Sequence, residues 1–218
     1  MASQTLSFTA CAHSAGEQAI LEAAVRLFSE QGFDGVSMRA VALEAGVSKS
    51  NIYHHFESKE ALYLAIWQHS AENLAVMVRG LAESEGDFET RLREFARNHL
   101  AHLFRNATTM RLMMREMMFG TSGNKHHVFE HAVGEVLETL IGIFENGQRA
   151  GLLRPGVDPA LCAFLILGTD TFYLLTDDMR HYPPMDKYTL PEERFSDELM
   201  DIILHGMLAE TGARSDQK

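Results

Sequence analysis

Polar side chains of several kinds gather between residues 48 and 54, directly after a glycine. They are Ser48, Lys49, Ser50, Asn51, Tyr53 and His54. A lysine offers a point charge to a phosphate, and a tyrosine combines a packing ring with a hydroxyl that can reach a phosphate. Asparagine can read adenine through a pair of hydrogen bonds. On the outer face of a helix, this set could hold the backbone and the base edges of double-stranded DNA.

The segment from Met38 to His55 presents these side chains if it forms two short helices joined by a tight turn. Gly46 supplies the left-handed backbone conformation that such a turn needs, and the small Ala42 lets the helices cross closely. Three branched residues fill the wedge between the helices: Val41, Val47 and Ile52. In this helix-turn-helix interpretation the second helix can enter the major groove. Two short helices around a glycine are also a common packing arrangement in all-α proteins.

Charge and composition restrict where nucleic acid could bind. The chain has 218 residues, 46% of them hydrophobic, which is enough for one or two domains with a core. Its formal net charge is −11, so the whole chain repels a polyanion and a contact with DNA has to be local. Residues 37–59 carry three basic side chains against two acidic ones. The acidic background makes this small basic segment stand out.

The two cysteines, Cys11 and Cys162, show no spacing typical of a disulfide or a zinc site, which favours a reducing cytoplasm. The first sixteen residues contain no lysine or arginine and do not resemble an export signal. The longest apolar run, residues 160–168, is too short to span a bilayer. We therefore expect a cytoplasmic protein without a membrane partner.

Helical spacing of apolar residues along almost the whole chain predicts an all-α fold of about nine helices. The first helix is expected to begin at Ser14 with a capping box to Glu17 and to end at Gly32. Asp158 followed by Pro159 predicts a later helix start. The expected helices cover residues 17–32, 37–44, 48–55, 58–80, 87–105, 107–119, 126–150, 158–180 and 192–210.

The stretch from Ile20 to Ile66 resembles the N-terminal domain of TetR/AcrR-type transcriptional regulators. The match in order and spacing lies in AAVRLFSEQGFDGVSMRAVALEAGVSKSNIYHHFESKEAL. The resemblance implies a disordered N-terminus over 1–16, a three-helix DNA-binding domain over 17–62, a helical ligand-binding and dimerisation domain over 63–211, and a flexible C-terminus over 212–218. It implies a ligand-responsive regulator, usually a repressor, that a small molecule releases from its operator.

The resemblance also assigns roles to individual residues. Ser37, which caps the second helix, touches a phosphate, and Lys59 meets a flanking phosphate. Lys49, Tyr53 and His54 hold the backbone or a base edge. The full candidate set is Ser37, Arg39, Ser48, Lys49, Ser50, Asn51, Tyr53, His54 and Lys59. Family members often have Gly and Thr in place of Ser50 and Asn51, Pro in place of Glu57, and Thr in place of Val36, so the base preference is open.

A single copy of the DNA-binding domain, which we call the head, attracts DNA only weakly. Two heads that act together gain affinity, which predicts a homodimer on a pseudo-palindromic operator. The last two long helices are the candidates for the interface, because in the family they form a four-helix bundle with the partner. Their apolar residues are Leu161, Leu165, Phe172, Leu199, Ile202, Ile203 and Met207. The alternative is that both apolar faces are buried within the monomer.

A methionine-rich helix suggests an adaptable pocket for a largely hydrophobic effector, although the same residues could form ordinary core. The candidate ligand-binding residues are His99, Met110, Arg111, Met114, Met117, Met118, Asp170 and Tyr173. Asp170 interrupts an apolar run, and a buried carboxylate needs a partner, either an internal arginine or a cationic ligand. The long connection from His181 to Pro191 could cover the pocket or wrap around a partner.

Other classes of function find less support in the sequence. His127 with His131, and His99 with His102, lie at helical spacing but have no cysteine or HExxH partner, so no metal is expected. No nucleophile elbow, phosphate loop or dinucleotide fingerprint is present, which leaves an enzyme without a mechanism and without an expected cofactor. The alternative to a regulator is a helical small-molecule carrier or scaffold that no longer binds DNA.

Overall fold

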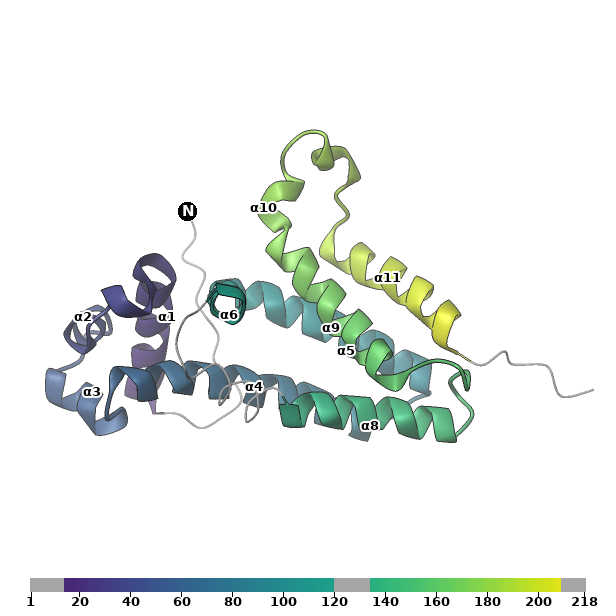
Figure 1. Cartoon of the computed structure of the whole chain (residues 1–218), viewed down its shortest axis with the longest axis horizontal. Helices are drawn as coiled ribbons and strands as arrows, with labels where there is room; N and C mark the ends of the chain where they lie inside the picture. Colours follow the sequence, from purple (N-terminus) through teal and green to yellow (C-terminus); the bar gives the residue numbers. More distant parts are fainter. Residues whose placement is uncertain (1–13, 120–133, 209–218) are drawn as a thin grey trace, which may run out of the picture. The chain divides into compact units, whose positions relative to one another are not determined.

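The computed structural model describes residues 14–119 and 134–208 and confirms the all-α prediction (Figure 1). These residues form ten α-helices, one short 3-10 helix, η2, and an isolated bridge between Leu153 and Leu208. None of the described helices is long and apolar enough to cross a membrane. The expected N- and C-terminal tails and the first part of the helix expected over 126–150 lie largely outside the described residues.

The chain divides into two compact units whose limits differ from the boundary expected at residues 62–63. Unit 1 comprises residues 1–76 and 104–135, and unit 2 comprises residues 77–103 and 136–218. Two helices, α4 (Lys59–Glu83) and α5 (Phe88–Arg105), cross from one unit to the other. The sequence pattern did not indicate that unit 1 includes a second, later segment.

Local chemistry sets the helix limits in unit 1, which contains α1 (Ala15–Gly35), α2 (Met38–Glu44), α3 (Lys49–His55), the first part of α4, and α6 (Ala107–Phe119). The Ser14 side chain accepts a hydrogen bond from the Glu17 amide, as the capping box predicts. Gly32, where the helix was expected to end, has φ +72° and marks a kink inside α1. Gly46 has φ +67° at the turn between α2 and α3.

The core of unit 1 gathers side chains from all of its helices. Val41 and Ile52 are fully buried between α2 and α3, as the helix-turn-helix interpretation requires. Leu112 and Met113 of α6 belong to the same core. Arg115, also on α6, donates hydrogen bonds to the carbonyls of Phe28 at 2.9 Å and Ser29 at 3.0 Å on α1. Helix α6 is therefore a structural part of the head.

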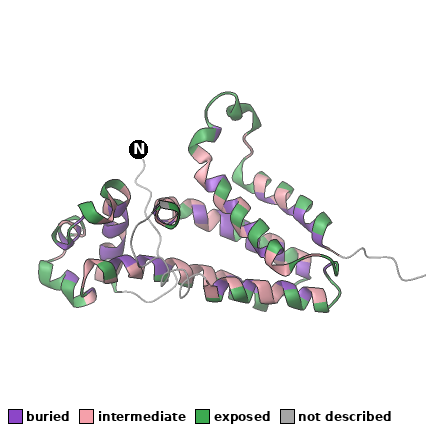
Figure 2. Ribbon diagram, viewed as in Figure 1, coloured by how far each residue is buried: buried purple, intermediate pink, exposed green. Residues whose placement is uncertain are grey.

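Unit 2 packs α5, α8 (Glu135–Arg149), α9 (Pro159–Leu175), α10 (Asp177–Arg180), η2 (Met185–Tyr188) and α11 (Glu192–Met207). Each long helix turns one apolar stripe inward (Figure 2). The Asp158 side chain accepts from the amides of Ala160 and Leu161, which confirms the predicted start of α9.

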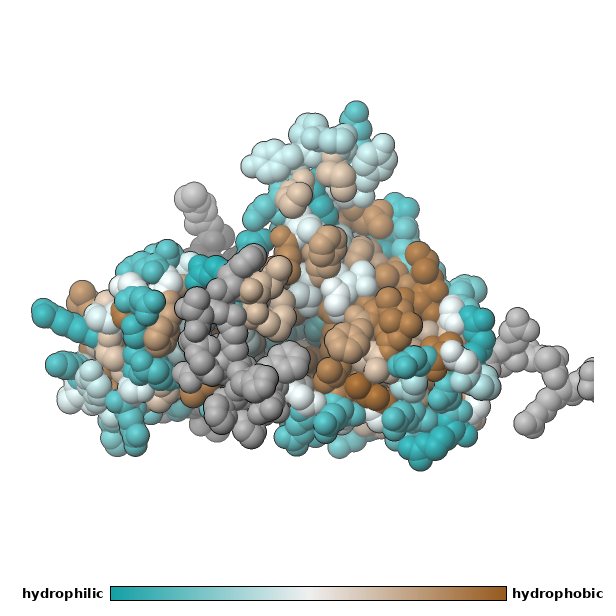
Figure 3. Space-filling view, in the orientation of Figure 1, coloured by the Kyte–Doolittle hydropathy of each residue, from teal (hydrophilic) through white to brown (hydrophobic). Residues whose placement is uncertain are grey.

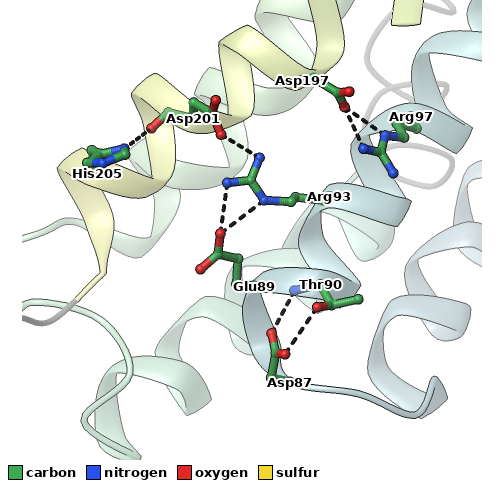
Figure 4. Close-up of polar contacts among 8 residues, drawn as sticks. All are labelled: Asp87, Glu89, Thr90, Arg93, Arg97, Asp197, Asp201 and His205. Atoms are coloured by element: carbon green, nitrogen blue, oxygen red, sulfur yellow. Dashed lines mark hydrogen bonds and ion pairs between the residues drawn. The ribbon is translucent and has the colours of Figure 1, made fainter. Parts of the chain in front are cut away.

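Ion pairs fix α11 against α5 on the surface of unit 2 (Figure 4). Arg93 lies 2.7 Å from both Glu89 and Asp201, and Arg97 lies 2.7 Å from Asp197. Exposed pairs of this kind contribute little to stability, about 0–1 kcal/mol each. The ion pairs between α5 and α11 therefore specify the register of the two helices more than they add to the free energy of unfolding.

Candidate nucleic-acid interface and buried polar centre

Helix α3 presents the predicted polar residues to solvent. Ser48, Lys49, Ser50, Asn51, Tyr53 and His54 are all exposed. Ile52, on the opposite side of the same helix, is fully buried against the core of unit 1. Helix α3 has only seven residues and a single apolar stripe. The burial of Ile52 on that stripe therefore fixes which side chains point outward.

Two predicted DNA-binding residues, Ser37 and Ser48, also act as helix caps. The Ser37 hydroxyl accepts a hydrogen bond from the Ala40 amide, and the Ser48 hydroxyl accepts one from the Asn51 amide, both at 3.1 Å. A hydroxyl that accepts in this way keeps its own O–H group for another acceptor. The Ser48 and Ser50 hydroxyls lie 2.9 Å apart.

The two lysines of the set lie in different surroundings. Lys49 is exposed, with its ammonium 6.0 Å from the centre of the Tyr53 ring. Lys59 is half-buried: its ammonium donates to the Phe33 carbonyl at 2.8 Å and lies 4.2 Å above the Phe33 ring. Lys59 thus ties the start of α4 to the end of α1, a structural role that the sequence analysis missed.

The acidic side chains around this surface are Glu44, Glu57 and Glu60. Glu44 forms an ion pair with Arg26 at 3.2 Å. Hydrogen bonds from its own backbone amide and from Ser58 lower the pKa of Glu60, which is therefore ionised at neutral pH. Arg39 and Glu57 are exposed. The basic character of the surface is therefore concentrated on Arg39 and Lys49.

Unit 2 contains a buried polar centre made by Asp170 of α9 and His99 of α5. Asp170 is 0% exposed and His99 is 3% exposed, and Oδ2 of the carboxyl lies 2.8 Å from Nδ1 of the ring. Within residues 14–119 and 134–208, no group forms a hydrogen bond with the other carboxyl oxygen, Oδ1. Burial raises the pKa of Asp170 above its ordinary value, although the contact with His99 acts in the opposite direction. The internal partner of Asp170 is therefore His99 and not an arginine, and the contact with a cationic ligand stays a prediction.

Tyr173, a predicted ligand contact, is part of an internal stack. The centre of its ring lies 3.6 Å from the centre of the Phe195 ring. The guanidinium carbon of Arg180 lies 3.4 Å from the centre of the same Tyr173 ring. Its hydroxyl donates to the Leu190 carbonyl. The side chain therefore anchors the connection between α10 and α11.

The remaining predicted ligand residues lie on α6 and belong to unit 1. Met110, Arg111 and Met114 are half-buried, whereas Met117 and Met118 are exposed near the end of the helix. His99, Asp170 and Tyr173 belong to unit 2. The prediction that all eight residues line one pocket therefore stays a prediction.

The predicted dimer residues divide into two groups. Leu161, Leu165, Phe172 and Ile202 are exposed, and Leu199 is half-buried. Ile203 and Met207 lie in the core of unit 2. Figure 3 shows hydrophobic side chains gathered on the face of unit 2 over α9. Phe164, which the sequence analysis did not single out, is exposed on the same helix.

Among residues 14–119 and 134–208, no group of three or more histidine, cysteine or acidic side chains could hold a metal ion. His127 and His131 lie outside the described residues.

Comparison with known proteins identifies the family. Residues 20–66 match the model of bacterial regulatory proteins of the tetR family, and residues 89–181 match the tetracyclin repressor-like C-terminal domain. The chain is 30% identical over 195 residues to the transcriptional regulatory protein RaaS of Mycobacterium tuberculosis, covering 88% of this chain and 86% of RaaS. The chain belongs to the TetR family.

Further relatives of this TetR-family regulator agree with that assignment. The transcriptional regulator RutR of Escherichia coli K12 is 29% identical over 204 residues, covering 89% of this chain and 91% of RutR. The structure of FadR from Bacillus subtilis in complex with stearoyl-CoA has the same fold, with a TM-score of 0.69 and 19% identity over 87% of this chain and 98% of FadR. The protein is a helix-turn-helix transcriptional regulator whose head includes residues 20–66.

Proposed function

We propose that this TetR-family regulator is a homodimeric repressor that binds a pseudo-palindromic operator through two copies of α3 and leaves it when a small molecule binds. The observation that carries the proposal is the outer face of α3, where Lys49, Asn51 and Tyr53 are exposed over a buried Ile52. Two heads held about 34 Å apart match successive major grooves, and linking them raises the effective concentration of the second.

Support for the dimer comes from the apolar surface of unit 2. Leu161, Leu165 and Phe172 form an exposed stripe on α9, and such a patch on a monomer commonly marks an interaction site. Gly168 lies within the stripe, and a Cβ built there would meet open space. A partner helix could therefore approach closely at this residue. Gly168→Arg should block the approach without disturbing the chain's own packing, and should yield a monomer in sedimentation velocity.

Support for a largely hydrophobic effector comes from the partly exposed methionines of α6 and from FadR, which shares the fold and was solved with stearoyl-CoA. Stearoyl-CoA and hexadecylamine are suitable probes because they differ in the sign of the head group. A probe that binds tightly but leaves operator affinity unchanged would contradict release.

The DNA-binding part is tested by footprinting the purified protein on DNA that flanks its own coding region, beside Tyr53→Ala. We expect a protected two-fold site that the variant loses because its ring and hydroxyl leave the outer face of α3. Glu30→Ala, an exposed change on α1, serves as the control and should keep the footprint. If genome-wide selection of bound fragments also recovers no two-fold site, the proposed operator binding is wrong, and the alternative of a small-molecule carrier that no longer binds DNA takes its place.

A further inference from the structure

We propose that residues 177–188, which we call the arm, dock on the second copy of this chain and complete the dimer interface. The arm consists of α10, η2 and the turn between them. It extends beyond the ends of α9 and α11 in unit 2 (Figure 1). The inference rests on the proposed dimer and assigns part of the interface to a segment outside the two long helices.

The inner side of the arm is firmly attached to unit 2. Arg180 is packed between the Tyr173 ring and the Asp177 carboxylate, which lies 2.7 Å from its guanidinium. The Thr189 hydroxyl donates to the Arg180 carbonyl at 2.7 Å, and the Met185 amide donates to the Tyr182 carbonyl at 2.9 Å. The arm is thus a folded element that holds its outer side chains in a defined place.

The exposed side chains of the arm include two tyrosines and two methionines beside charged residues. Tyr182 is 69% exposed and Tyr188 is 74% exposed, and Met179 and Met185 are exposed beside them. Tyrosine and methionine are enriched at protein interfaces, because they offer large contact areas. The arm has three acidic residues against two basic ones, Arg180 and Lys187, so its charge does not favour a polyanion as its partner.

The arm follows the exposed stripe of α9 along the chain. The Thr176 amide donates to the Phe172 carbonyl at 3.0 Å, and the Arg180 amide donates to the Thr176 carbonyl at 3.1 Å, so α10 follows α9 with Thr176 alone, at φ −94° and ψ 5°, between the two helices. Met179, the apolar side chain of α10, is exposed. A second copy that covers the α9 stripe meets the arm at its end.

The exposed large side chains of α9 and α11 alone offer less area than one partner buries in a standard dimer interface. A standard interface buries about 800 Å² on each partner. A large side chain has roughly 150–250 Å² of surface, and five side chains are exposed on α9 and α11: Leu161, Phe164, Leu165, Phe172 and Ile202. At their exposed fractions they offer on the order of 600 Å². At their exposed fractions the four arm side chains add on the order of 500 Å², and the total then exceeds the standard area per partner.

The experiment compares the dimer dissociation constant of the full chain with that of the double variant Tyr182→Ser/Tyr188→Ser by sedimentation velocity. Each substitution acts twice in a two-fold dimer, so we expect the dissociation constant to rise about 100-fold. The matched control is Asp186→Asn/Lys187→Gln, which changes two exposed residues of the same arm and should change the constant by less than about threefold. Circular dichroism confirms that each variant is folded.

A second measurement separates the arm from the proposed dimer itself. Gly168→Arg removes the α9 contact, and amide hydrogen exchange at residues 182–188 is then compared between the native dimer and this monomer. Slower exchange in the dimer supports the arm. Equal exchange, or an arm variant that dimerises like the wild type while Gly168→Arg is monomeric, overturns the arm proposal alone. If Gly168→Arg still forms the native dimer, the proposed dimer face is wrong.

Discussion

Removing His99 should expose the cost of the buried carboxyl at Asp170. His99→Ala takes away the hydrogen bond to Oδ2, and Oδ1 already has no partner in the described part of the chain, so the carboxyl keeps none there. Asp170 is 0% exposed, which excludes relief by bulk water. The side chain must then either remain charged and unpaired or bind a proton.

The size of the effect follows from proton binding. An aspartate in the unfolded chain has a pKa of about 3.9, and keeping it protonated in the folded chain costs about 1.4 kcal/mol for each pH unit above that value. At pH 7 the cost is about 4 kcal/mol, which is the upper limit of the loss relative to the wild type because the raised pKa of Asp170 already costs the wild type part of it. For a chain of this length it corresponds to a fall in Tm of roughly 8–16 °C.

The dependence on pH has a definite sign. Burial raises the pKa of Asp170, so the folded chain binds this proton more tightly than the unfolded chain. The resulting stability is fully present below the unfolded pKa and is lost as the pH rises through the folded pKa. Loss of His99 removes the contact that lowers this pKa and raises it further. The deficit of His99→Ala relative to the wild type therefore grows with pH, by up to about 1.4 kcal/mol per unit.

Thermal unfolding followed by circular dichroism at pH 5 and pH 7 measures this deficit. The control is the double variant His99→Ala/Asp170→Asn, which carries no buried charge. It should lose less stability than His99→Ala at pH 7, and its own stability should carry no pH dependence from position 170, because an asparagine does not ionise. A loss below about 1 kcal/mol for His99→Ala at pH 7, or the same loss at both pH values, would refute the reasoning.

Three further predictions concern other parts of the chain. Lys49→Ala should weaken operator binding and reduce the slope of log K against log salt by about one, measured by fluorescence anisotropy; an unchanged slope means that Lys49 does not contact a phosphate. Arg115→Ala should cost about 1–3 kcal/mol in urea unfolding because it frees two carbonyls of α1, and a neutral result would show that these bonds contribute nothing. Gly46→Ala should lower the Tm because its φ is +67°, whereas Gly142→Ala, inside α8 with open space around it, should raise the stability by about 0.5–1 kcal/mol; the same sign for both would contradict the backbone argument.

Local features of the fold could be predicted because they depend on neighbouring residues. The caps at Ser14 and Asp158 and the left-handed turn at Gly46 each require only a few adjacent positions, and all three are present. The outer face of α3 followed from the helical period once Ile52 was assigned to the core. These predictions needed no knowledge of the tertiary fold.

Contacts between distant residues could not be predicted in the same way. Asp170 pairs with a residue 71 positions away, and the sequence indicated only that a partner was needed. The family resemblance assigned Lys59 to a phosphate, which stays a prediction, but a lysine near a helix start does not reveal that the Phe33 carbonyl is within reach. An apolar stripe on a helix also does not show whether it faces the core or an interface. For this reason Ile203 was predicted at the dimer interface, although it is buried in the monomer.

The discontinuous make-up of unit 1 limits how this head can be exchanged between regulators. A chimaera joined at the end of the first segment of the unit, at Val76, would bring Ile20 and Phe28 without α6, and so without Leu112 and Met113 of their shared core. The transplanted head would expose apolar surface or depend on whatever helix the host provides. A recombinant regulator with a new operator preference should therefore inherit α6 together with α1–α4, or keep the native head and redesign only the outer face of α3.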